Sequence, residues 1–173
     1  DVDFNAFAHC LCIVDTKGSH ADLTDEYAAV PEEMKAVAHC FGKELLGEIT
    51  ESEFLQNLAK IREVVGDRAL LRTLHWFAEN ERVEAQVLAL EQGEFDRFKQ
   101  LIKESGNSSF KYLQNVYSTK NIKDQSVSLA LGLSDMFLAS KGVSRVHGGG
   151  FAGTIQAFVP KARSAEYRAA IDS

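Results

Sequence analysis

The two ends of this 173-residue chain carry strand patterns, and helical patterns fill the span between them. His9–Asp15 is a largely apolar run that ends before Lys17 and Gly18, which is typical of a strand buried on both faces. Near the other end, Val143–His147 and Thr154–Pro160 form two further strand patterns around a glycine-rich turn. Strands at both ends with helices between them predict an α+β domain whose sheet is mainly antiparallel or mixed.

Apolar residues at helical spacing predict the helices between the strands. Pro31 suits the first turn of a helix, where its missing N–H costs nothing. Thr50 and Glu53 have the spacing of a capping box, and Asp67 opens the longest pattern, which continues to about Gln92. Further helices are predicted at about 95–106, 110–117, 130–142 and 164–171. Inward-facing positions are expected at Met34, Val37, Ala38, Phe41, Phe54, Leu58, Ile61, Leu70, Leu74, Phe77, Val83, Val87, Leu90, Ala130, Leu133, Met136 and Phe137.

The charge balance excludes some classes of partner. The formal net charge is −6, from 19 basic and 25 acidic residues, and the basic residues are scattered. A nucleic-acid-binding protein would show a basic stripe, whereas a phosphorylated substrate needs only a local positive site. No run approaches the roughly 20 apolar residues of a membrane span, and no leader pattern is seen. We therefore expect a cytoplasmic protein that binds neither nucleic acid nor membrane.

The three cysteines, Cys10, Cys12 and Cys40, are expected to be free thiols in the core. Together with His39 they could suggest a site for a soft metal. Their spacing does not fit, because zinc sites use ligands such as C-x-x-C on turns. Cys10 and Cys12 would share one face of a strand, while the other two residues belong to a helix. We expect no metal site.

The most unusual local sequence is the glycine-rich segment SRVHGGGFAGT, residues 144–154. Four glycines within six residues, Gly148, Gly149, Gly150 and Gly153, indicate positive φ angles or close backbone approach. The segment matches G-x-G-x-x-G, but a strand follows it where a dinucleotide site needs a helix. No Lys-Ser or Lys-Thr pair follows, so it is not a Walker A loop. Two interpretations remain: a close-packed turn without a ligand, or a glycine turn that lines an active site.

The same segment resembles the third conserved motif of the galactokinase branch of the GHMP kinases, R-M-T-G-G-G-F-G-G. Its departures, Val146-His147 and Ala152, resemble the bacterial form R-V-H-G-G-G-F-A-G-T-I-Q. Three more segments resemble those enzymes, in the correct order along nearly the whole chain. They are residues 18–37, 75–83 and 103–115. The chain is therefore similar to the C-terminal part of a bacterial galactokinase.

This resemblance implies a single C-terminal domain over residues 1–173, with helices packed on a mainly antiparallel, ferredoxin-like sheet. The family transfers phosphate from ATP to the C1 hydroxyl of galactose with Mg²⁺, using a phosphate loop and an Asp base that are not found here. The chain starts at Asp1 inside a strand pattern, so we expect a fragment, inactive alone and without a bound cofactor. Asp124-Gln125 lies too late in the order to be the catalytic pair and is expected at a helix start, so no catalytic residue is assigned.

The resemblance also implies where the chain meets the sugar. Tyr27 occupies the tyrosine position of the S-x-x-x-L-x-x-x-Y pattern, whose phenol contacts galactose in the family. The alternative is a half-buried tyrosine at the start of a helix. Gly148, Gly149, Gly150 and Gly153 would support the phosphate loop and the sugar pocket. His20 is a candidate residue of the cleft, whereas His75 and His147 are expected to have packing roles.

Other functions remain open at this point. One is a galactokinase-like sensor that binds sugar and ATP and regulates transcription. Another is a kinase for a related sugar such as N-acetylgalactosamine, and a third is an acidic interaction domain with a structural glycine turn. The expected partners of the whole protein are galactose and ATP. A face left open by the missing half, on the side of the sheet that bears the glycine turn, is also expected to allow self-association.

Overall fold

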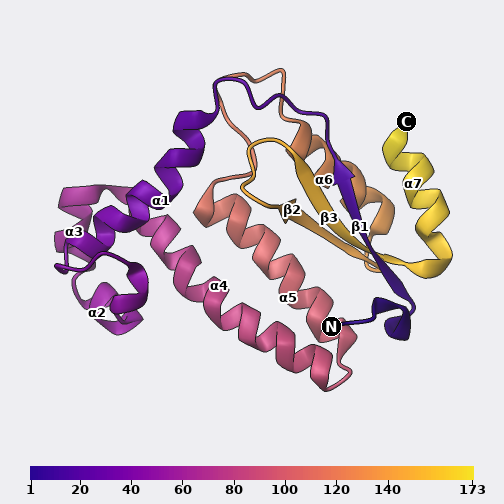
Figure 1. Cartoon of the computed structure of the whole chain (residues 1–173), viewed down its shortest axis with the longest axis horizontal. Helices are drawn as coiled ribbons and strands as arrows, with labels where there is room; N and C mark the ends of the chain where they lie inside the picture. The colour runs from indigo at the N-terminus through magenta and orange to yellow at the C-terminus, as the bar shows by residue number, and fades with distance from the viewer.

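The computed structural model describes all 173 residues. Its sheet has three antiparallel strands, β1 (His9–Asp15), β2 (Val143–His147) and β3 (Thr154–Pro160), in the order β1-β3-β2. The last two strands have the bounds that the sequence predicted, and the first is joined to β3 from His9, opposite Pro160, to Asp15, opposite Thr154. The predicted α+β class with an antiparallel sheet is confirmed (Figure 1).

Seven α-helices surround or extend from this sheet: α1 (Thr24–His39), α2 (Glu51–Gln56), α3 (Leu58–Val65), α4 (Asp67–Glu91), α5 (Phe95–Ser108), α6 (Ser126–Leu138) and α7 (Ser164–Asp172). Short 3₁₀ turns span Phe4–Phe7, Leu46–Glu48 and Lys161–Arg163, and α5 continues into a π-helical turn, Ser109–Leu113. Figure 1 shows α2 and α3 at the end of the molecule away from the sheet, with α1 and α4 leading from them toward it.

The two faces of the sheet are covered by different helices. On one face, Phe158 and Val143 pack against α5, with aromatic residues from its first turns. On the other face, Ala157 and Val159 pack against Leu138 of α6 and against α7. Alternating residues of β3 therefore enter two separate cores, as the two-residue period of a strand requires. A further core lies among α1 to α4, with Phe54 and Val37 fully buried at its centre.

The prediction that β1 is buried on both faces is wrong. Leu11 is 43% exposed and Ile13 is 51% exposed, while Cys10, Cys12 and Val14 on the other face are partly buried. β1 is an edge strand, and α5, which covers this face of the sheet at Phe158 and Val143, leaves Leu11 and Ile13 of β1 exposed. An apolar run alone does not distinguish an edge strand with one open face from a central strand.

The predicted start of the first long helix is also wrong. Pro31 lies inside α1, seven residues after the helix begins at Thr24. The helix starts earlier because Asp25 and Glu26 in its first turn interact favourably with the free N–H groups there. Pro31 has no N–H to offer to the carbonyl of Tyr27, one turn earlier, so the α-helical ladder has a gap beside that residue.

Several predicted inward positions face solvent. They are Leu58, Val83, Val87, Leu133 and Met136, and Cys40 is exposed as well. The predicted second helix is broken at Asn57 into α2 and α3, although its Thr50–Glu53 capping box is present. Gly106 does not end α5 but lies within it, where a Cβ would stand 3.0 Å from that of Arg145. The separate helix predicted at 110–117 is not present: residues 110–113 belong to the π turn that continues α5, and 114–117 are not helical.

Candidate functional site

Tyr27 brings α1 into contact with the glycine-rich turn that joins β2 to β3. Its hydroxyl donates a hydrogen bond to the carbonyl oxygen of Gly150, 2.8 Å away. Its ring lies flat against Gly149, where an added Cβ would come within 3.1 Å of Cε1. Burial raises the pKa of Tyr27, so the phenol remains a donor at neutral pH. The tyrosine is partly buried and joins the helical part of the chain to the sheet.

His20 contacts the same hydroxyl of Tyr27. Its Nδ1 is 3.1 Å from the Tyr27 oxygen, and the two rings are stacked with centroids 6.3 Å apart. A Cβ on Gly153 would meet the His20 ring at 3.5 Å. The structure therefore brings together all the residues that the sequence analysis had selected: Tyr27, His20 and the four glycines. A phenol oxygen has one hydrogen and two lone pairs, so it can accept one bond beyond these two partners.

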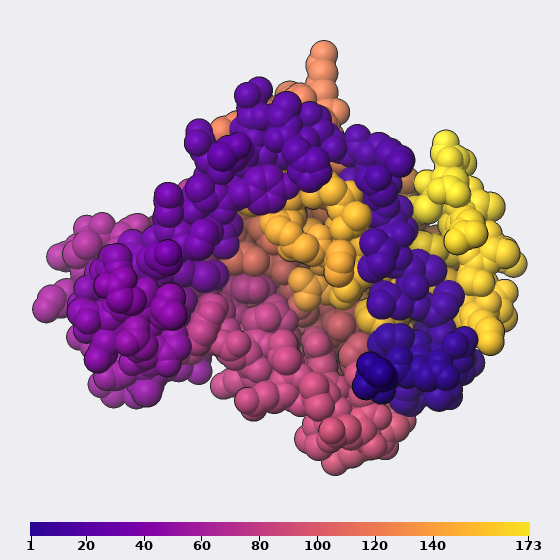
Figure 2. Space-filling view, viewed as in Figure 1, coloured from indigo at the N-terminus to yellow at the C-terminus, as the bar shows by residue number.

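The glycine turn needs its glycines. Gly148, Gly150 and Gly153 have φ of +76°, +81° and +96°, which L side chains rarely adopt. Gly148 has open space where a Cβ would lie, whereas a Cβ on Gly150 would overlap the carbonyl of Asn115. The turn is thus open at one glycine and tightly packed at another. Figure 2 shows the orange residues of the turn and β3 at the floor of a hollow, with α1 and β1 along its sides.

Asn115 is a residue of this site that the sequence analysis did not select, although it ends one of the segments that carried the resemblance. Its carbonyl oxygen accepts the N–H of Phe151 at 2.6 Å, and its side-chain Nδ2 donates to the Gly149 carbonyl at 3.3 Å. Asn115 is 4% exposed, and its Oδ1 has no hydrogen-bond partner. Single-residue signals could not have found it, because its role depends on a contact between distant segments.

Arg72 on α4 was also missed, since a charged residue in a helix is usually solvated. It is 1% exposed and forms an ion pair with Glu33 of α1. Its Nε donates to the carbonyl of Leu113 at 2.9 Å, and its Nη2 lies 3.4 Å from that of Gln114. Burial lowers the pKa of Arg72, and the carboxylate of Glu33 opposes that shift.

A second cluster of polar side chains lies further along α4, where His75 and Glu79 contact serines of α5. Glu79 accepts from Ser105 at 2.7 Å and lies 3.3 Å from His75 Nε2. Ser105 also accepts from Arg145 of β2 at 2.5 Å, so the strand that leads into the glycine turn is tied to α4 and α5. His75 is buried and bonded to Ser108 as well, which confirms the predicted packing role. Burial lowers the pKa of His75 to about 4.

Other candidate positions lie outside this group. Asp124 accepts the backbone N–H of Ser19 at 3.0 Å and lies just before α6, close to where the sequence analysis expected a helix start. His147 is exposed and its Nδ1 is 3.2 Å from Gln156. No cluster of three or more His, Cys, Asp or Glu side chains is arranged to hold a metal ion. None of the helices is long and apolar enough to cross a membrane.

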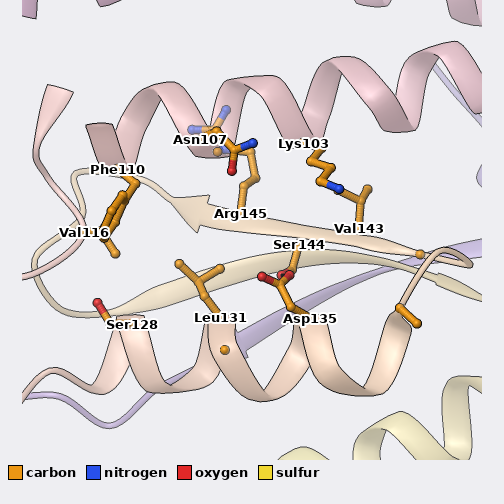
Figure 3. Close-up of a pocket in the computed structure, with 14 residues that line it drawn as sticks. Lys103, Asn107, Phe110, Val116, Ser128, Leu131, Asp135, Val143, Ser144 and Arg145 are labelled. Atoms are coloured by element: carbon orange, nitrogen blue, oxygen red, sulfur yellow. The ribbon is translucent and has the colours of Figure 1, made fainter. Parts of the chain in front are cut away.

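A separate cavity of about 410 Å³ lies between α5 and α6 along the free edge of β2. Figure 3 shows Lys103 and Asn107 entering it from α5, and Leu131 and Asp135 from α6. None of Tyr27, His20 or the four glycines lines it. The site assembled by Tyr27 and this cavity are therefore different places in the fold.

No protein-family model matches the chain. The chain is 28% identical over 158 residues to a galactokinase of Mannheimia succiniciproducens, and 26% identical over 152 residues to one of Actinobacillus pleuropneumoniae. These matches cover 91% and 88% of the chain but only 39% and 38% of the relatives. The chain thus spans about two fifths of the length of the curated relatives it matches.

The fold is also similar to that of solved structures, and one of them matches almost the whole chain. It is the Lactococcus lactis galactokinase in complex with galactose, with a TM-score of 0.71 and 21% identity, over 95% of this chain and 40% of that one. The match shows that this chain has the fold of part of that galactokinase. More particularly, the matches confirm the resemblance of this chain to the C-terminal domain of galactokinases.

Proposed function

We propose that residues 1–173 form the C-terminal domain of a cytoplasmic kinase that uses ATP to phosphorylate galactose at C1. The observation that carries this proposal is the site itself. Tyr27 and His20 contact each other and Tyr27 contacts the glycine turn, in a chain that matches galactokinases along most of its length. The phosphate loop, the catalytic base and any Mg²⁺ ligands belong to the rest of the protein, so this chain alone is inactive.

In this proposal Tyr27 contacts the sugar. Its oxygen has a lone pair left after its bonds to Gly150 and His20, and a sugar hydroxyl is a suitable donor. Gly148 has open space on its Cβ side, so ligand or catalytic loop can approach the backbone there. His20 holds the same phenol through its Nδ1. The residues of this chain bind and orient the substrate, and in phosphoryl transfer positioning of this kind is a large part of catalysis.

Two other functions share this geometry. A galactokinase-like sensor would bind the same sugar and ATP but would not turn them over. A kinase for N-acetylgalactosamine would keep the glycine turn and differ in residues around the sugar. Both differ from a galactokinase mainly outside these 173 residues, so the experiment has to include the rest of the protein.

The test uses this chain alone and fused behind the N-terminal part of a bacterial galactokinase. We expect weak galactose binding by the chain alone in ligand-observed NMR, no ATP turnover by it, and galactose-dependent ATP consumption by the fusion. Glucose and N-acetylgalactosamine serve as comparison sugars. The fusion takes its catalytic groups from the galactokinase, so the sensor is tested in the natural full-length protein. Galactose binding by that protein without turnover would favour the sensor. Turnover by the isolated chain would contradict our assignment of the catalytic groups to the missing part.

We also propose that the open face of β1 is covered by another protein surface in the whole protein. Leu11 and Ile13 are both large, apolar and about half exposed on the same side of the strand. In the isolated chain this face is available for self-association. An oligomer of the chain would therefore say little about the oligomeric state of the kinase.

A further inference from the structure

The charge of Arg72 is enclosed deep in the molecule, and its contacts explain why. A guanidinium at 1% exposure is costly unless its N–H groups find acceptors. Arg72 finds three acceptors: the carboxylate of Glu33 and the backbone carbonyls of Leu113 and Gln114. Two of the three acceptors are main-chain atoms of the loop that follows α5. The arginine is therefore placed to hold a backbone segment, not only to neutralise a carboxylate.

That backbone segment has an unusual conformation. α5 ends in a π-helical turn, Ser109–Leu113, and Gln114 is left-handed with φ of +56°. The carbonyls at the end of a helix lack intrahelical partners, and a left-handed residue other than glycine is strained. π turns occur frequently at functional sites. The two carbonyls that Arg72 reaches are those of the last π residue and of the left-handed residue, so it stabilises the conformation where it is least stable by itself.

The next residue, Asn115, contacts the glycine turn at three points. Its carbonyl accepts from Phe151, its side chain donates to Gly149, and its carbonyl closes the space beside Gly150. The position of Asn115 follows from that of Gln114, to which it is covalently bonded. Hence a shift of the carbonyl that Arg72 holds would move the glycine turn as well.

These contacts form a chain of interactions that begins and ends on α1, which we call the circuit. Starting at α1, Glu33 binds Arg72, Arg72 holds Gln114, Asn115 holds the turn, and Gly150 accepts from Tyr27, which lies on α1 again. Glu33 and Tyr27 are less than two helical turns apart. A circuit that returns to the same helix fixes the glycine turn relative to the tyrosine from two sides.

We infer that Arg72 is a positioning residue, which sets the glycine turn against Tyr27 by holding the Leu113 and Gln114 carbonyls and by binding Glu33. This inference rests on the proposed function in one respect only, that the Tyr27 site receives galactose. Arg72 touches no substrate in this scheme and acts through Asn115. Lysine cannot replace it fully, because one ammonium cannot match the planar fork that reaches a carboxylate and two carbonyls at once.

The first test measures amide hydrogen exchange in this chain, with Arg72→Met and Arg72→Lys. The Phe151 N–H donates to the Asn115 carbonyl, so its exchange rate reports directly whether Asn115 holds the glycine turn. We expect it to exchange at least tenfold faster in Arg72→Met and by an intermediate factor in Arg72→Lys, while amides of the β1–β3 ladder change less than twofold. Arg62→Met is the matched control, since Arg62 pairs with Asp67 on the surface. Unchanged Phe151 exchange in folded Arg72→Met would overturn the inference.

Arg72→Met could unfold the chain, and two milder variants then keep the test decisive. Glu33→Gln removes the charge that Arg72 pairs with, and Asn115→Ala removes the bond to Gly149 while leaving Arg72 in place. Both are expected to speed exchange at Phe151 or its neighbour Ala152 by threefold or more, without loss of the ladder amides. If exchange at Phe151 and Ala152 is the same in both variants as in the unaltered chain, the circuit is contradicted.

The second test separates positioning from simple support of the fold. In the fusion with an N-terminal galactokinase part, Arg72→Lys is expected to raise the KM for galactose at least fivefold and to change kcat less than twofold. Faster exchange at Phe151 together with an unaltered KM for galactose would contradict the positioning role. If the unaltered fusion shows neither galactose binding nor turnover, the proposed function fails, but the exchange result still decides whether Arg72 holds the turn.

Discussion

The hydroxyl of Tyr27 donates to the carbonyl of Gly150 at 2.8 Å, across 123 positions of sequence. It connects two parts of the molecule that have separate cores, the helices α1 to α4 and the sheet with its covering helices. The bond lies at the place where a strand-to-strand turn needs positive φ and tolerates no side chain. The junction between the two parts and the candidate site are therefore the same place.

Changing Tyr27 to Phe should weaken galactose binding much more than it weakens the fold. The ring keeps its packing on Gly149, but the bond to Gly150 and the open acceptor for the sugar are lost. A neutral hydrogen bond contributes about 1 kcal/mol to stability, so the loss on urea unfolding should be of that order. Galactose affinity should fall about tenfold or more, measured by titration of the fusion protein. Tyr117→Phe, at a more exposed tyrosine, is the control; equal affinity for both variants would refute a sugar contact.

Changing Gly150 to Ala should be more damaging than the same change at Gly93. Both glycines have positive φ, +81° and +72°, so both variants pay a left-handed penalty of about 1–2 kcal/mol. Only Gly150 has the Asn115 carbonyl in the space of the new Cβ, whereas nothing lies within 4 Å at Gly93. The difference between the two midpoints of urea unfolding isolates the effect of the close contact. Equal losses would show that the turn can relax away from Asn115.

The sequence predicted the elements with strong local signals. The bounds of β2 and β3 follow from β-branched residues on either side of the glycines, and the Thr50–Glu53 capping box forms as its spacing predicts. The grouping of Tyr27 with the turn followed from the resemblance, not from periodicity. Each of these depends on a short stretch of chain or on a known order of motifs.

The sequence could not predict which apolar residues lack a partner. Val83 and Val87 have the spacing of a buried stripe, yet each is 50% exposed because no element of this chain covers that part of α4. In the same way, Arg72 and Asn115 are defined by contacts with residues 39 and 34 positions away, Glu33 and Gly149. Burial of a charge is decided by tertiary partners, which one-dimensional patterns do not contain.

Replacing Leu11 or Ile13 by Lys should reduce self-association of the isolated chain without unfolding it. Both side chains are about half exposed on the open face of β1, so a lysine can extend into solvent there. We expect a lower weight-average mass by sedimentation at equal protein concentration and a thermal midpoint within a few degrees of the unaltered chain. Val64→Lys is the control, since Val64 is 74% exposed but lies on α3. Unchanged mass for the β1 variants would place any association elsewhere.

Stability should fall as the pH is lowered from about 6.5 toward 4, and His75 should account for much of the fall. Burial lowers the pKa of His75 from 6.5 to about 4 in the folded chain, against the opposing charge of Glu79. Between these values the unfolded state binds more protons, so protonation favours unfolding; the stabilising effect is present above pH 6.5 and is lost below it. In His75→Gln, the stability difference between pH 7.5 and pH 4.5 should shrink by about 2 kcal/mol. The measurement is urea unfolding at four pH values, with His39→Gln at an exposed histidine as control. A His75→Gln profile parallel to that of the unaltered chain would mean that His75 takes up its proton in the folded state as readily as in the unfolded one.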